Sequence, residues 1–183
     1  MSIYIALLRG INVSGYNKIK MTELKLLFIN EGFNDITTYI QSGNVIFKSD
    51  ESDTNKLEKQ LIKAIKLQFN YSISVLILAE EKLQTIYTSN PFLQRSNIDI
   101  SKLYVTLLND APFKEGIPLL KSYSTKQEEF YIDNKTVYLY YPNGYGRSKL
   151  TNNVIESKLK TSATSRNWKT ISKLVELNSK KIE

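Results

Sequence analysis

The chain has 183 residues, of which 42% are hydrophobic and 23% are charged, and this composition is typical of a folded globular protein. It contains no cysteine and no histidine, which excludes disulfides, thiolate nucleophiles, imidazole acid–base catalysis and nearly all structural zinc sites. No uncharged apolar run approaches the roughly 18 residues of a membrane helix, and the first residues lack the basic region of a signal peptide. The sequence therefore predicts a cytoplasmic protein with no membrane association, no metal and no cofactor.

The first part of the chain alternates short strands with helices. Apolar spacing predicts a strand at 2–9, a helix at 21–31, strands at 36–41 and 45–48, an amphipathic helix at 54–69 and a strand at 73–79. A polar loop rich in glycine and asparagine, 10–20, joins the first strand to the first helix. The resulting order, β-α-β-β-α-β, is that of a ferredoxin-like fold.

The second part repeats this order approximately. Its predicted elements are a short helix at 80–88, a strand at 102–108, a helical turn within 112–123, a hairpin of 128–132 with 136–141, and helices at 151–160 and 166–178. After the short helix the order is thus β-α-β-β-α-α, with a helix where the first part has its last strand. No internal repeat is visible in the sequence itself.

The charge is unevenly distributed. Residues 1–140 hold 16 basic and 15 acidic residues, whereas residues 141–183 hold 9 basic and 3 acidic ones, so the last quarter carries nearly all of the net charge of +7. A basic segment indicates a surface that faces nucleic acid, a nucleotide or another phosphate, although two solvated basic helices would give the same excess. Three of the four arginines, Arg9, Arg147 and Arg166, stand beside glycine or asparagine, where a planar bidentate donor favours recognition.

Two polar motifs fall at the same end of the first predicted sheet. In a split β-α-β unit the third strand lies between the parallel first and second strands, so the loop after the first strand meets the hairpin between the second and third. One arginine with several neutral amides can bind an oxyanion together with a sugar or a base edge, although each motif also fits an ordinary loop or hairpin. The candidate ligand-binding residues here are Arg9, Gly10, Asn12, Gln41, Ser42, Gly43 and Asn44.

Two further motifs lie in the basic quarter. In the first, glycines deliver Arg147 and Lys149 to a predicted helix start that Thr151 could cap, and this pattern favours an anion at the helix N-terminus. In the second, Thr164 or Ser165 is expected to cap the last helix, and Arg166 either joins the anion site or pairs with Glu156. The candidates from these motifs are Gly146, Arg147, Ser148, Lys149, Asn152, Arg166 and Asn167.

Four ordered segments carry a resemblance to a known family: 7–13 (LLRGINV), 39–45 (YIQSGNV), 146–152 (GRSKLTN) and 163–170 (ATSRNWKT). They resemble the bacterial family called domain of unknown function 1697, over nearly the whole chain. The resemblance implies an α+β fold of two ferredoxin-like (βαββαβ-type) subdomains with mainly antiparallel sheets. It implies no activity, because the family is uncharacterised. We therefore expect one subdomain at 1–90 and a second, with basic C-terminal helices, at 91–183.

The loops and the charge favour binding of an anionic ligand, either a nucleic acid or a nucleotide or other phosphate-bearing small molecule. Two alternatives stay open. One is a histidine-free enzyme on a phosphorylated or nucleotide substrate, with Arg9, Arg147 and Lys149 stabilising charge, although no candidate base falls inside a motif. The other is a protein-interaction module that uses an apolar and aromatic surface.

Overall fold

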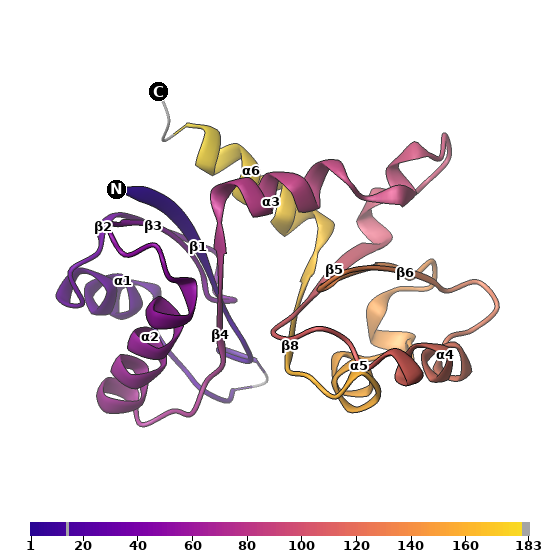
Figure 1. Ribbon diagram of the computed structural model, residues 1–183, viewed down its shortest axis with the longest axis horizontal. Coiled ribbons are helices and arrows are strands. Elements are labelled where there is room, and N and C mark those ends of the chain that lie inside the picture. The colour runs from indigo at the N-terminus through magenta and orange to yellow at the C-terminus, as the bar shows by residue number, and fades with distance from the viewer. Residues whose placement is uncertain (14, 181–183) are drawn as a thin grey trace. The chain divides into compact units, whose positions relative to one another are not determined.

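The computed structural model describes residues 1–13 and 15–180. The chain divides into two compact units, Met1–Thr85 together with the segment that begins at Leu174, and Ile86–Lys173. Each unit contains one four-stranded antiparallel sheet with helices packed on it (Figure 1), so the expected α+β fold of two ferredoxin-like units is confirmed. Within the described part of the chain, no helix is both long enough and apolar enough to cross a membrane.

The first unit has the strand order β2-β3-β1-β4. Its elements are β1 (Ser2–Leu8), α1 (Met21–Asn30), β2 (Asn34–Tyr39), β3 (Asn44–Ser49), α2 (Thr54–Phe69) and β4 (Val75–Ala79), and α3 (Glu80–Thr88) follows. All neighbouring strands pair antiparallel, so β1 and β2 run parallel with β3 between them. The ends of β1 and β2 and the start of β3 therefore lie at the same end of the sheet, as the sequence predicted.

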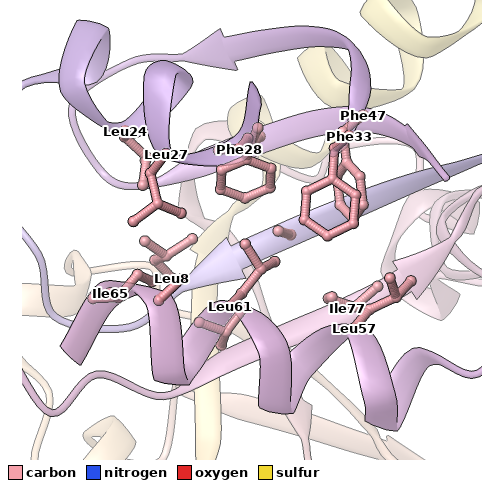
Figure 2. Packing of buried hydrophobic residues seen from close by; sticks show 14 of the residues in the cluster. Leu8, Leu24, Leu27, Phe28, Phe33, Phe47, Leu57, Leu61, Ile65 and Ile77 are labelled. Carbon is pink, nitrogen blue, oxygen red and sulfur yellow. The ribbon is translucent and has the colours of Figure 1, made fainter. Parts of the chain in front are cut away.

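Helices α1 and α2 enclose the core of the first unit against this sheet (Figure 2). Along α2, Leu57, Leu61 and Ile65 recur every fourth residue and are almost completely buried, which confirms the predicted apolar face. The rings of Phe33 and Phe47 pack with their centroids 4.7 Å apart. Further core residues come from α1 and from alternate positions of the strands: Leu24, Leu27, Phe28, Tyr4, Ala6, Leu8, Val45 and Ile77.

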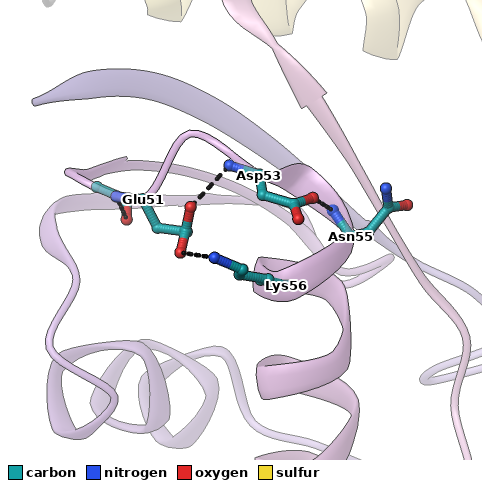
Figure 3. Close-up of polar contacts among 5 residues, drawn as sticks. Glu51, Asp53, Asn55 and Lys56 are labelled. Atoms are coloured by element: carbon teal, nitrogen blue, oxygen red, sulfur yellow. Dashed lines mark hydrogen bonds and ion pairs between the residues drawn. The ribbon is translucent and has the colours of Figure 1, made fainter.

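Helix α2 begins with a set of polar contacts that fixes its first turn (Figure 3). Asp53 is the N-cap, and its Oδ1 accepts a hydrogen bond of 2.9 Å from the Asn55 backbone N–H. The carboxylate of Glu51 accepts from the Asp53 N–H at 2.9 Å and pairs with Lys56 Nζ at 3.3 Å. These contacts, first the backbone hydrogen bond and then the lysine, hold the pKa of Glu51 below its ordinary value.

The second unit repeats the strand order, as β6-β7-β5-β8. Its strands and helices are β5 (Leu103–Leu108), α4 (Ile117–Leu120), β6 (Glu129–Asp133), β7 (Thr136–Tyr140), α5 (Asn152–Leu159) and β8 (Ala163–Asn167). Helix α6 (Trp168–Ser179) follows, and its residues from Leu174 onward belong to the first unit. Its short 3-10 turns are Pro91–Gln94, Ile100–Lys102, Lys114–Gly116, Lys121–Tyr123 and Tyr145–Arg147. The core of this unit includes Leu108 from β5, Val137 and Leu139 from β7, and Ile155 and Leu159 from α5.

One predicted element is wrong. The last helix was expected to begin at residue 166 behind a cap at Thr164 or Ser165, but Ala163–Asn167 is strand β8 and the helix begins at Trp168. The backbone of β8 pairs antiparallel with β5, and this long-range pairing overrides the local cap signal. The helix is capped by Asn167, whose Oδ1 accepts a hydrogen bond of 2.8 Å from the Thr170 N–H.

The two sheets end in the same way. In the first unit the Leu8 N–H donates to the Gly43 carbonyl at 2.8 Å, and the next N–H donates to the Ser74 carbonyl at 2.9 Å. In the second unit the Leu108 N–H donates to the Lys135 carbonyl at 2.8 Å, and the next donates to the Ser162 carbonyl at 3.0 Å. In both units, the end of the central strand is thus hydrogen-bonded on each side to the residue just before the neighbouring strand. From there the chain continues from β1 towards α1 and from β5 towards α4.

Candidate ligand-binding cleft

The loop between β1 and α1 has an irregular backbone that its own side chains hold in place. Gly10, Asn12, Gly15 and Asn17 all have positive φ, which glycine and asparagine adopt more easily than other residues. Asn12 Nδ2 donates to the carbonyls of Ile19 and Gln41, both at 2.9 Å, and its Oδ1 accepts from the Ile19 N–H at 2.9 Å. Asn12 therefore ties the loop both to itself and to the β2–β3 turn.

This loop, the β2–β3 turn and the start of α1 border an open cleft of about 560 Å³. The residues that line it are Asn12, Gly15, Lys18, Ile19, Lys20, Glu23 and Gln41. Lys20 is the N-cap residue of α1, and its side chain makes no capping hydrogen bond. The cleft therefore adjoins the positive end of a helix dipole and carries two lysines and one glutamate on its walls. We call it the β1–α1 cleft.

Only some of the first group of predicted residues line this cleft. Asn12 and Gln41 line it, and Gly10 lies exposed in the same loop. Asn44, which was expected on the shared surface, is instead fully buried. Its Nδ2 donates to the Tyr39 carbonyl at 3.1 Å and to Ser42 Oγ at 2.9 Å, so its amide shapes the turn from inside.

Gly43 and Arg9 have separate roles at the same end of the sheet. A Cβ atom on Gly43 would lie 2.7 Å from Leu8 Cβ and 2.8 Å from Ile11 Cδ1, so only glycine fits between the turn and the core. Arg9 is half-buried where β1 ends beside β4, and its N–H donates to the Ser74 carbonyl. Arg9 is not among the residues that line the cleft.

The second group of predicted residues surrounds the start of α5. Gly144 has a φ of 87° and opens a turn in which Gly146 and Arg147 are exposed, as is the following Lys149. Ser148 is buried, and its Oγ accepts from the Leu150 N–H at 2.9 Å. This turn presents the two cations to solvent.

Two backbone donors in the first turn of α5, where an anion was expected to bind, already donate to protein groups. Thr151 is the N-cap, as predicted, and its Oγ1 accepts from the Val154 N–H at 3.4 Å. The Asn152 N–H donates to the hydroxyl of Tyr145 at 3.2 Å. Protein groups therefore take two of the hydrogen bonds that were expected to go to a ligand, and anion binding by Arg147 and Lys149 stays a prediction.

Asn152 and Glu156 hold strand β8 in place. The Asn152 amide donates to the Ala163 carbonyl at 3.0 Å and accepts from Ser165 Oγ at 2.6 Å, while Glu156 Oε1 accepts from the Ala163 N–H at 2.7 Å. Arg166, within β8, is buried and donates from Nη1 to the Ser165 carbonyl at 2.9 Å. Burial lowers the pKa of Arg166 to about 10.

A second hollow, of about 380 Å³, lies in the second unit. It is lined by two lysines and by two glutamates whose carboxylates already accept hydrogen bonds from other protein groups. Glu128 Oε2 accepts from the Thr125 N–H at 2.8 Å, and Glu129 forms a bidentate pair with Arg95 at 2.7 and 2.8 Å. The Arg95 hydrogen bonds hold the pKa of Glu129 below its ordinary value, so this carboxylate places a negative charge beside the two lysines. This hollow is less suited to an anion than the β1–α1 cleft.

The sequence motifs include two residues of the cleft, Asn12 and Gln41, but none of its charged residues. Lys18, Lys20 and Glu23 fall within or just after the polar loop, yet a chain with 25 basic residues gives no reason to single out two lysines. The available signal was their position, on either side of the buried Ile19 and just before a predicted helix start. Across residues 1–13 and 15–180, no three acidic side chains gather in a way that could hold a metal ion.

The topology and the loop-bounded cleft define a protein of two ferredoxin-like α+β units. A family model described as "Protein of unknown function (DUF1697)" matches residues 1–138, so the chain belongs to this family, which confirms the resemblance seen in the motifs. The solved structure of conserved bacterial protein SP0830 from Streptococcus pneumoniae is similar, with a TM-score of 0.76 and 23% identity over 96% of this chain and 97% of that one. That likeness concerns the fold. No curated protein matches the chain.

Proposed function

We propose that the chain binds a phosphate-bearing anion in the β1–α1 cleft. The observation that carries the proposal is the position of Lys18 and Lys20 on the cleft wall, beside a helix start that has no side-chain cap. Phosphate oxygens accept hydrogen bonds from ammonium groups and are favoured at the positive end of a helix dipole. Gln41 adds a neutral amide, which can both donate and accept.

The cations of the cleft are accessible to an incoming ligand. Lys20 Nζ lies 3.8 Å from Glu23 Oε1, and the two side chains are 82% and 45% exposed. An exposed pair of this kind contributes about 0–1 kcal/mol, whereas a hydrogen bond between charged partners contributes about 1.5–3 kcal/mol. A phosphate group therefore competes well with Glu23 for Lys20.

The cleft is formed before any ligand arrives. The three hydrogen bonds of the Asn12 amide and the bond of 3.0 Å from Asn17 Nδ2 to the Gly10 carbonyl fix the loop that carries Lys18. Pre-organisation reduces the entropy that binding must overcome. The volume of about 560 Å³ also falls within the range of roughly 300–1,000 Å³ that is usual for small-molecule sites.

Calorimetric titration with inorganic pyrophosphate at low ionic strength tests the proposal. Lys18→Ala and Lys20→Ala should each weaken binding about tenfold, since each removes one charge-assisted contact. Lys25→Ala is the matched control, because Lys25 is an exposed lysine of α1 that does not line the cleft, and its affinity should stay unchanged.

Arg147→Ala separates the two candidate sites. If Arg147→Ala abolishes binding while Lys18→Ala and Lys20→Ala leave it unchanged, the anion site belongs to the second unit and the cleft proposal is wrong. The absence of any heat of binding for the unaltered protein, at millimolar pyrophosphate and low salt, would also reject it.

A further inference from the structure

Three residues that directly neighbour lining residues of the β1–α1 cleft in the chain expose apolar side chains, which a site for a bare anion does not need. Tyr16 is 75% exposed, Val13 is 57% exposed and Ile40 is 48% exposed. Tyr16 lies in the chain between Gly15 and Lys18, which both line the cleft, and Ile40 directly precedes Gln41, which also lines it. Apolar groups exposed beside a polar cleft are typical of a binding surface.

The backbone of Tyr16 makes a local hydrogen bond. Its N–H donates to the Val13 carbonyl at 2.9 Å, and the two residues form an isolated antiparallel bridge. Asn12 and Asn17, on either side of Val13 and Tyr16 in the chain, hydrogen-bond to Gln41 and Gly10 respectively, and Lys18 and Lys20 follow Tyr16 within four residues. An exposed tyrosine ring offers a flat apolar face, and its side chain has few rotatable bonds to order on binding.

We infer that the phosphate-bearing ligand is a nucleoside phosphate, an inference that rests on the proposed function. The phosphate binds Lys18 and Lys20, the base stacks on Tyr16, and the Gln41 amide contacts the edge of the base. An aromatic ring stacks well on a nucleobase, and Val13 and Ile40 add further exposed apolar surface in the adjoining segments. A sugar phosphate without a base would leave this apolar surface uncovered.

The arrangement suits a single nucleotide. The cleft is lined by two lysines, its loop carries one exposed tyrosine, and its volume is about 560 Å³. A free nucleotide and one nucleotide of a single-stranded nucleic acid present the same chemistry to these residues. The experiment therefore includes both sources as separate arms.

The test compares inorganic triphosphate with nucleoside triphosphates by calorimetry on the full chain. We expect at least one nucleoside triphosphate to bind about tenfold more tightly than triphosphate, because only the nucleotide can stack. Tyr16→Ala should abolish this difference without weakening the binding of triphosphate itself, and Tyr16→Phe should preserve it. Tyr131→Ala is the matched control, since Tyr131 is 53% exposed on β6 of the second unit and should leave both affinities unchanged.

The outcomes separate the two proposals. If triphosphate binds and no nucleotide binds more tightly, or if Tyr16→Ala keeps the preference, the nucleoside inference is overturned while the anion site stands. If neither ligand binds, both are overturned. In the second arm, a 5′-phosphorylated single-stranded oligonucleotide that binds more tightly than any free nucleotide, with the same loss in Tyr16→Ala, supports the inference and identifies nucleic acid as the source.

Discussion

Asparagine side chains in this protein fix the backbone at the positions where recognition was expected. Asn12 joins the β1–α1 loop to the β2–β3 turn, Asn44 shapes that turn from inside, and Asn152 holds β8. The sequence does not distinguish an asparagine that binds a ligand from one that binds the backbone, because both functions use the same amide donor and acceptor. Sequence motifs therefore located the shared end of β1, β2 and β3 in the first sheet, but they did not reveal which amides face solvent.

Gly43 gives the sharpest prediction for a single residue. Gly43→Ala should destabilise the protein by more than about 1 kcal/mol, because the added Cβ would lie 2.7 Å from Leu8 Cβ at a φ of 74°. Gly10→Ala is the control, since Gly10 has a similar φ of 67° but no atom within 4 Å of the new Cβ. Urea unfolding of both variants separates overpacking from backbone strain, and equal losses would show that the close contact has no effect.

Among the elements, helix α2 was the easiest to predict and strand β8 the hardest. The apolar face of α2 repeats within 16 residues, so a local pattern defines it. Ala163–Asn167 carries no comparable pattern, and its conformation depends on pairing with β5. Thr164 and Ser165 before an apolar stretch also resemble a helix cap, and this signal led to the wrong boundary.

The buried face of α2 can be tested directly. Leu61→Ala should reduce the free energy of unfolding by about 2–5 kcal/mol, because Leu61 is completely buried and truncation leaves a cavity. Ile62→Ala is its neighbour control, since Ile62 is 37% exposed and its loss should cost much less. Denaturant titrations of both variants provide the measurement, and a small effect of Leu61→Ala would mean that the core collapses around the missing side chain.

The start of α2 should make stability depend on pH. Because its contacts lower the pKa of Glu51 from the ordinary 4.5, the ionised carboxylate stabilises the folded state above that value, and this contribution is lost as the pH falls through the folded-state pKa. Glu51→Gln should therefore be less stable than the unaltered chain near neutral pH. The gap should close well below pH 4.5 in parallel unfolding experiments. A gap that persisted in acid would assign the effect to something other than the charge.

For the whole molecule, the salt dependence of binding reports how many cations contact a ligand. If only Lys18 and Lys20 contact phosphates, the logarithm of affinity for a short single strand should fall against log salt with a slope of about −1.4. Contacts from many of the nine basic residues in 141–183 would make the slope several units steeper. Fluorescence anisotropy at increasing salt gives the slope, and Arg147→Ala should leave it unchanged when the cleft alone binds.

The equivalent hydrogen bonds at the ends of β1 and β5 have an evolutionary consequence. Leu8 and Leu108 occupy equivalent positions in the two sheets, as do Gly43 and Lys135, so the two units share one backbone scaffold. In the second version Lys135 Nζ reaches the Asn109 carbonyl at 2.6 Å and draws the hairpin turn onto the outgoing loop, whereas in the first version a polar loop borders a cleft at this point. A scaffold present twice allows a loop in one copy to diversify under selection while the other copy stays free to change in a different direction.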